Sequence, residues 1–200
     1  MNNIEFFSQY SPYYSKILWY ETPTVYDHLR MLFENANRKL IKQDADLFRR
    51  NSSEISICGA LMQKLKSSLW GTPFSHYYID IEYNRNFNYP KLIYSNGKKR
   101  KITCDLIVHS RGQNINQDNL ISVEMKKSDI DKEKKERDRD RLMVLTSPSF
   151  DGIWRFDGTE LPPYVCRYIL GVYYEIRDNN ILLEYYRHGT LQYTDEIPWQ

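Results

Sequence analysis

Two carboxylates and one lysine occupy positions at which they could act together on a metal ion: Asp105, Glu124 and Lys126. Eighteen residues separate the two acids, which is enough for two adjacent strands and the loop between them. Side chains along a strand alternate between its faces, so Lys126 must project from the same face as Glu124. If the two strands are neighbours in a sheet, the three side chains converge on one site.

This combination of residue types suits the hydrolysis of phosphodiesters. Carboxylate oxygens are hard ligands for Mg²⁺, which takes about six ligands and keeps several waters. The ion lowers the pKa of a bound water and neutralises charge that develops on the phosphate. The lysine could position that water, help to deprotonate it or stabilise the transition state. The three residues therefore predict Mg²⁺-dependent catalysis, with Asp105 and Glu124 as the metal ligands.

The surrounding sequence indicates the elements that would position these residues. Apolar residues alternate with other side chains along 102–109 and again along 120–126, which is typical of strands. A helix is predicted from Glu54 to about Leu69, after three residues able to cap it, and Glu54 lies on the face of its core side chains. Glu54 is thus a fourth candidate for the site. Its alternative role is a glutamate favoured by the helix dipole.

The remaining elements complete an α/β pattern with a mixed sheet. Apolar residues at spacings of three and four predict a helix from Thr24, directly after Pro23. A charged helix over 131–141 would be supported by pairs such as Asp131–Lys135. Further strands are predicted at 77–83, 152–156, 167–176 and 181–187, with a hairpin turn at 94–97.

The segment Cys104-Asp105-Leu106-Ile107-Val108-His109, followed by Val123-Glu124-Met125-Lys126-Lys127, resembles the signature of the PD-(D/E)XK nuclease superfamily. The helix that begins at Glu54 is similar to the first core helix of that fold, which often contributes a further glutamate beside the metal. The stretch 81–85 is also similar to segments in bacterial relatives. Position 104 is cysteine where the signature has proline, a residue that is not a ligand and is frequently replaced.

The resemblance implies a restriction-endonuclease-like mixed β-sheet flanked by helices. It places the nuclease-like domain at 51–200 and leaves 1–50 as a helical N-terminal extension. It also implies a Mg²⁺-dependent nuclease, with Mn²⁺ as a substitute ion and DNA preferred over RNA. A homodimer with two-fold symmetry would suit the cutting of both strands of a duplex.

Composition excludes several other classes of protein. The 28 basic and 26 acidic residues nearly balance, so net charge alone does not argue for nucleic-acid binding. Cys58, Cys104 and Cys166 form no C-x-x-C pair and predict neither a disulfide framework nor a zinc site. The chain has no signal-peptide pattern and no membrane-spanning apolar run, so a cytoplasmic protein without a membrane partner is expected.

Two basic residues beside the trio are candidate nucleic-acid contacts, Lys127 and Arg111. Lys127 opens the charged segment after the catalytic strand, and Arg111 lies in the loop between the two key strands. The alternatives are a solvated helix face for Lys127 and an ordinary loop position for Arg111. The alternative function for the whole chain is a catalytically silent, nuclease-like module that binds nucleic acid or a protein partner.

Overall fold

The computed structural model describes residues 24–95, 97–114, 117–149 and 163–200. The helices are α2 (Val25–Asp44), α3 (Asp46–Arg49), α4 (Glu54–Leu69) and α5 (Lys132–Thr146). The main sheet contains β1 (Tyr78–Tyr83), β6 (Cys104–His109), β7 (Asn119–Lys127), β8 (Leu170–Ile176), β9 (Asn180–Arg187) and β10 (Thr190–Pro198). Two short hairpins pair β2 (Arg85–Asn86) with β3 (Tyr89–Pro90), and β4 (Leu92–Ser95) with β5 (Lys98–Lys101).

The main sheet is mixed, in the order β1-β6-β7-β8-β9-β10. Its pairs are antiparallel except for β7 and β8, which run parallel. Parallel neighbours need a long crossover, and the connection between these two contains α5. The predicted α/β class with a mixed sheet is therefore confirmed for the described residues.

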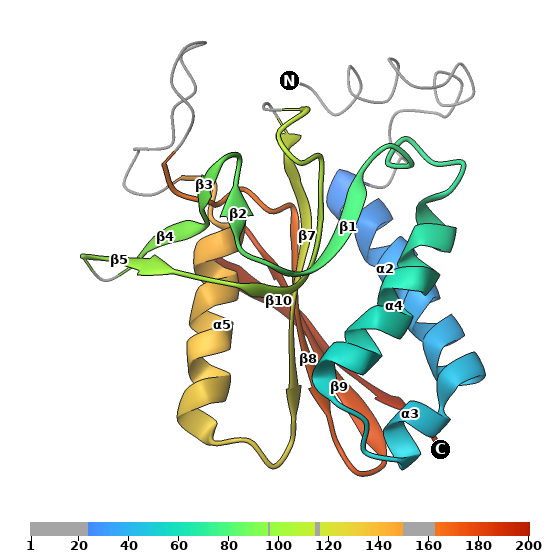
Figure 1. Ribbon diagram of the computed structural model, residues 1–200. Helices are drawn as coiled ribbons and strands as arrows, with labels where there is room; N and C mark the ends of the chain where they lie inside the picture. Colours follow the sequence, from blue (N-terminus) through green and yellow to red (C-terminus); the bar gives the residue numbers. More distant parts are fainter. Residues whose placement is uncertain (1–23, 96, 115–116, 150–162) are drawn as a thin grey trace.

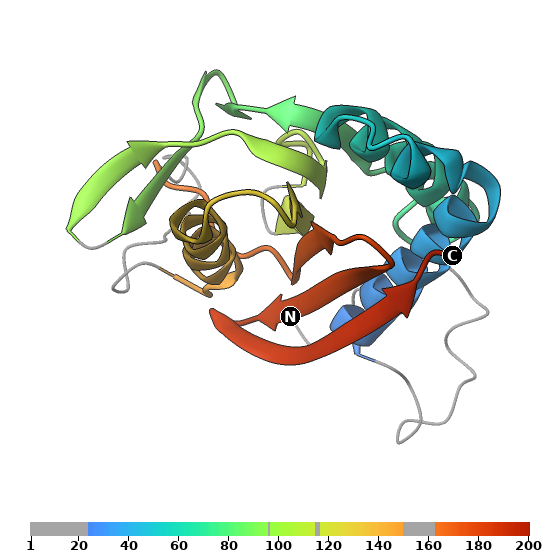
Figure 2. The same cartoon turned by 90° about the horizontal axis from the view of Figure 1, so that it is seen from below.

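Helices cover both faces of the sheet, with α5 on one face and α2 and α4 on the other (Figures 1 and 2). The larger core lies on the α2–α4 face and includes Leu29 and Phe33 of α2, Leu61 of α4 and Val123 of β7, all fully buried. Helix α2 also reaches β8, where the Tyr174 hydroxyl donates a 2.8 Å hydrogen bond to Asn37. The predicted N-terminal extension thus contributes α2 to the same core as the rest of the fold.

Local sequence patterns predicted the positions of several elements correctly. Helix α4 covers the predicted range, and Ser53 caps it by accepting a hydrogen bond from the Ser56 amide. Helix α2 begins after Thr24, which forms a capping box with Asp27. The paired β4 and β5 confirm the hairpin predicted around 94–97.

Other expectations need correction. The Asp131–Lys135 pair does not form, because Asp131 caps α5 and Lys135 contacts Glu175 at 3.3 Å instead. Helix α5 also extends to Thr146, five residues beyond the predicted end. Strand β10 was not predicted, since most of its residues are exposed and it lacks an apolar alternation. The strand predicted at 152–156 lies outside the described residues.

Candidate active site

The candidate site lies where β6 and β7 separate. Their pairing runs from His109–Asn119 to Leu106–Val123 and stops there. Past this point the Asp105 carboxylate accepts a 2.8 Å hydrogen bond from the Met125 amide. Unpaired backbone amides are costly when buried, so a carboxylate here replaces the lost strand partner.

A second carboxylate caps the same edge of β7. Glu54, the first residue of α4, accepts a 3.0 Å hydrogen bond from the Lys127 amide through Oε1. Because Glu54 stands at a helix N-terminus, the helix dipole also favours its negative charge. Glu54 therefore has a structural role and also contributes a carboxylate to the site. Its hydrogen bond to the Lys127 amide fixes α4 against the end of β7.

Lys126 lies at the centre of a group of carboxylates from three elements. Its Nζ is 3.4 Å from Glu54, 3.4 Å from Asp105 and 3.3 Å from Asp138 of α5. Burial lowers the pKa of Lys126, but the charges of Asp105, Asp138 and Glu54 outweigh burial and leave that pKa raised. The amine is therefore held as an ammonium ion between its acidic neighbours.

Glu124 is fully buried beneath α5, so the sheet face that carries it is not solvent-exposed. One of its oxygens, Oε2, accepts a 2.7 Å hydrogen bond from Arg141, while Oε1 has no hydrogen-bond partner among the described residues. Burial raises the pKa of Glu124 well above its ordinary value, and the Arg141 charge offsets only part of that effect. A carboxylate oxygen without a protein partner in this position can bind a cation or accept a hydrogen bond.

Two further members of the site, both on α5, are not among the residues predicted from the sequence. Asp138 is 4% exposed. Arg141 forms ion pairs with Asp138, at 3.1 Å, and with Glu124, at 2.7 Å. A signal was present in the helical spacing, because Asp138 precedes the buried Leu142 by four residues and therefore shares its face. The dense charge of the segment hid it, since charged runs are usually solvated.

The two candidate nucleic-acid contacts lie apart from this centre. The Lys127 side chain turns to the α3–α4 connection and donates a 2.9 Å hydrogen bond to the Asn51 carbonyl. Arg111 follows the opposite end of β6, where it binds Asp80 through Nε at 2.8 Å and lies over the Tyr78 ring. The Asp80 carboxylate also contacts His109 at 2.8 Å. Both basic side chains are thus held by protein groups.

The site's donors suit a hard divalent cation. With all six groups ionised, four carboxylates face two cations and leave a formal charge of −2, and neither histidine nor cysteine takes part. The present side-chain arrangement is different: among the described residues, no three acidic, histidine or cysteine side chains are placed to hold a metal. The physical reason is that Lys126 separates three carboxylates, while Glu124 turns to Arg141.

No helix of the described residues has the length and apolar character needed to cross a membrane. Comparison of the chain with models of protein families, with curated proteins and with solved structures finds no match.

Proposed function

We propose that this protein is a Mg²⁺-dependent nuclease of the restriction-endonuclease-like kind that acts in the cytoplasm, with Mn²⁺ as a substitute ion and DNA as the preferred substrate. The observation that carries the proposal is the contact of Lys126 with Asp105 where β6 and β7 separate, with Glu124 joined to the same group through Arg141 and Asp138. Glu54 and Asp138 add two more carboxylates from flanking helices. This arrangement resembles the site that the sequence signature implies.

In this proposal Asp105 and Glu124 hold the ion, with Glu124 using the oxygen that has no protein partner. The bound metal supplies a water of lowered pKa and positive charge next to the phosphate. Arg141 holds the other Glu124 oxygen and its second nitrogen is held by Asp138, so its positive charge lies beside a carboxylate that would bind the ion.

Lys126 acts as a donor in this scheme. Its carboxylate neighbours raise its pKa, so it carries a proton at neutral pH. A protonated amine stabilises the negative charge that builds on a phosphate oxygen, and it also orients an attacking water. A role as proton acceptor would first require a metal to neutralise the neighbouring carboxylates.

A second candidate function is the catalytically silent module, and the Glu124–Arg141 pair is the observation that favours it. A buried carboxylate paired with an arginine 2.7 Å away has a structural role without any metal. Such a protein would bind nucleic acid or a protein partner but would neither take up Mg²⁺ nor turn over substrate.

The test is a cleavage assay on plasmid DNA and on RNA with Mg²⁺, with Mn²⁺ and with chelator. We expect metal-dependent DNA cleavage that falls by at least about 100-fold in Glu124→Gln, Asp105→Asn and Lys126→Met, because each change removes a ligand or a charge at the reacting centre. Analytical ultracentrifugation of the same samples, with and without duplex, would show whether cutting accompanies a homodimer.

The matched control is Glu184→Gln. Glu184 is also a buried glutamate paired with an arginine of α5, since Arg139 holds it at 2.8 Å, but it stands on β9 outside the site. We expect this variant to cleave like the unchanged protein. Cleavage that survives Glu124→Gln, or tight DNA binding without metal uptake, would exclude the proposed catalysis and support the silent module.

A further inference from the structure

Positive charge is unevenly distributed along this chain. Residues 83–104 contain six basic residues and no acidic one, although the whole protein has a net charge of only +2. The remaining 178 residues therefore carry a net charge of −4. The near-balance of the composition thus conceals a strongly basic segment that ends one residue before Asp105.

Most of this charge lies on the β4–β5 hairpin. Lys98, Lys99, Arg100 and Lys101 form the whole of β5, and all four are exposed. The ion pairs formed within the described residues involve none of them. Three basic residues of α5 differ in this respect, because Lys135, Arg139 and Arg141 are each paired with a carboxylate. The charge of β5 is therefore available to an anionic partner.

The hairpin is anchored firmly at its base. Ile93 is buried in one cluster with Leu145 of α5, and the Val165 amide donates a 2.8 Å hydrogen bond to the Leu92 carbonyl. Lys91 is buried too, and its Nζ donates a 2.9 Å hydrogen bond to the Tyr168 hydroxyl. The base of the hairpin is therefore held against α5, the helix that carries Asp138 and Arg141 of the site.

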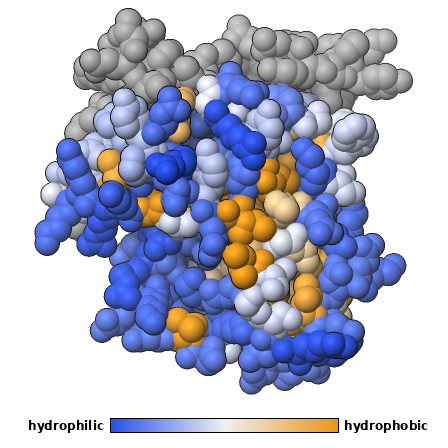
Figure 3. All heavy atoms as spheres, viewed as in Figure 1, coloured by the Kyte–Doolittle hydropathy of each residue, from blue (hydrophilic) through white to orange (hydrophobic). Residues whose placement is uncertain are grey.

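The hairpin projects beyond α5 and away from the sheet (Figures 1 and 2). The surface on that side of the molecule is mainly hydrophilic (Figure 3). Its link to the site is direct, because the Thr103 carbonyl lies 3.4 Å from the same Arg141 nitrogen that holds Glu124. An extended chain spans at most about 3.6 Å per residue. The Cα atom of Lys101 therefore lies within roughly 14 Å of the Asp105 Cα atom, and that of Lys98 within roughly 25 Å.

We infer that the β4–β5 hairpin is a phosphate-binding arm that holds the backbone of duplex DNA while one strand enters the site. This inference rests on the proposed function, because a phosphodiester substrate must continue beyond the scissile bond. Phosphates follow one another every 3.4 Å along each strand, so the arm can cover up to about seven base pairs from that bond. Lysine and arginine contacts to the backbone carry affinity without base sequence.

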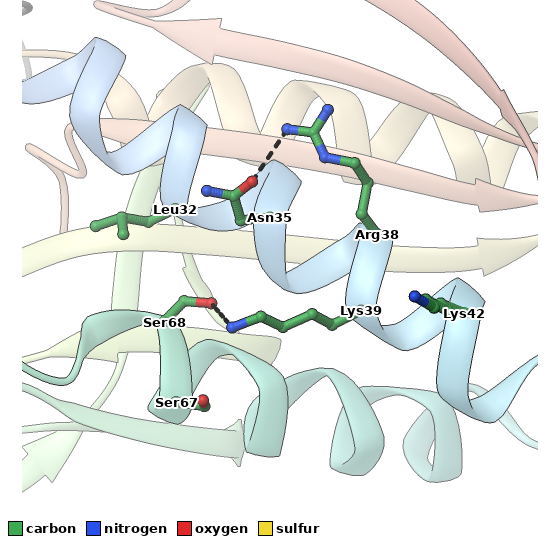
Figure 4. Close-up of a pocket in the computed structure, with 7 residues that line it drawn as sticks. All are labelled: Leu32, Asn35, Arg38, Lys39, Lys42, Ser67 and Ser68. Carbon is green, nitrogen blue, oxygen red and sulfur yellow. Dashed lines mark hydrogen bonds between the residues drawn. The ribbon is translucent and has the colours of Figure 1, made fainter.

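A second basic surface provides a matched control. Arg38, Lys39 and Lys42 of α2 line a groove beside α4 (Figure 4), and Lys66 of α4 lines a second pocket that shares Ser67 with this groove. Two of these cations have protein partners: Arg38 contacts Asn35 at 3.2 Å and Lys39 contacts Ser68 at 3.5 Å. The four substitutions R38Q/K39Q/K42Q/K66Q remove the same total charge as K98Q/K99Q/R100Q/K101Q, but from a different face.

The experiment measures binding of a labelled DNA duplex of about 20 base pairs in chelator over a range of salt concentrations, where no cleavage occurs. We expect the β5 variant to bind at least about tenfold more weakly at low salt, with a log–log salt slope reduced by roughly 3–4, since each phosphate contact contributes about 0.9. The groove variant and the charge-retaining K98R/K99R/K101R should bind like the unchanged protein.

Two further readouts separate this inference from the proposed function. Bis(p-nitrophenyl) phosphate is too small to reach the arm, so its metal-dependent hydrolysis should be unchanged in the β5 variant. If the protein hydrolyses neither substrate but the β5 variant loses DNA binding, the proposed phosphate-binding arm is supported and the proposed nuclease activity is refuted. If the protein hydrolyses these substrates but the β5 variant binds DNA as the unchanged protein does, the nuclease proposal is supported and the arm is refuted.

Other outcomes overturn the arm. Equal weakening in the β5 and groove variants would show dependence on total charge alone. Loss of binding to phosphatidylserine-containing vesicles with unchanged DNA binding would assign β5 to a membrane surface. Circular dichroism of each variant establishes that the hairpin substitutions, all at exposed positions, leave the fold intact.

Discussion

At the scale of single residues, the candidate site is a balance between burial and charge. Glu124 is fully buried, and Arg141 supplies the nearest compensating charge. Lys126 forms ion pairs with three other carboxylates at once. The pKa values of Glu124 and Lys126 therefore depend on the charged groups around them as well as on burial.

The first prediction concerns the pH dependence of stability without metal. Burial raises the pKa of Glu124 above its unfolded value, so its contribution to folding is present at low pH and lost as pH rises towards the folded pKa. Relative to Glu124→Gln, the unchanged protein should lose stability with rising pH above about 4.3, by up to roughly 1.4 kcal/mol per pH unit. Urea unfolding of both proteins in chelator across that range measures the difference.

The control has the opposite sign. Burial tends to raise the pKa of Glu175, but hydrogen bonds from Arg177 and Tyr173 and the charge of Lys135 leave that pKa lowered. Its contribution is therefore present above the unfolded pKa and lost as pH falls. The unchanged protein should gain stability relative to Glu175→Gln as pH rises. Parallel pH slopes for the two variants would refute this account of Glu124.

At the scale of elements, the site depends on how closely α5 approaches the sheet. Gly171 of β8 lies under the C-terminal half of that helix, where a Cβ would stand 2.8 Å from Thr146 Cγ2 and 3.1 Å from Tyr186 Cβ. Only glycine fits this contact without a shift of the neighbours. The same helix carries Asp138 and Arg141, so its position sets the position of both groups.

The second prediction compares two glycine substitutions. Gly171→Ala should lower the free energy of unfolding by about 1–3 kcal/mol, because the added methyl group overpacks the α5–β8 contact. Gly59→Ala in α4 should raise it by roughly 0.5–1 kcal/mol, since the nearest atom is 3.9 Å away and alanine favours helices. Urea unfolding measures both, and DNA cleavage should fall only in Gly171→Ala. A stable, fully active Gly171→Ala would show that α5 tolerates displacement.

At the scale of the whole molecule, α2 belongs to the same core as the sheet. Phe33 is fully buried and meets the Tyr185 ring edge-on at a centroid distance of 6.3 Å. Leu29, Ala36 and Leu40 are buried beside it. The far end of the chain joins this core as well, since Trp199 stacks on Phe48 at a centroid distance of 5.7 Å.

The third prediction follows from this shared core. Phe33→Ala should cost about 3–5 kcal/mol, and circular dichroism and tryptophan fluorescence should report one coincident unfolding transition. Met31→Ala is the control, because that side chain is 48% exposed on the outer face of α2 and its loss should cost less than about 0.5 kcal/mol. Two separate transitions would show that the N-terminal helices fold as an independent unit.

Local sequence patterns determined much of this molecule. Alternation identified β6 and β7, helical spacing identified α2 and α4, and together they brought Asp105, Glu124, Lys126 and Glu54 into one hypothesis. The strand and helix predictions are confirmed because the period of side-chain directions is a property of each element alone. They also gave the mixed α/β class, since the order of helices and strands limits how the layers can stack.

Only the tertiary structure decided which charges meet. Arg141 and Asp138 come to Glu124 and Lys126 from a helix whose charged run predicted a solvated face, and β10 pairs with β9 without an apolar pattern of its own. Both depend on contacts between elements distant in the chain, which local periodicity does not encode. The same is true of the basic hairpin: its composition was readable in the sequence, but its anchoring beside α5 and its link to the site through Thr103 arise from packing.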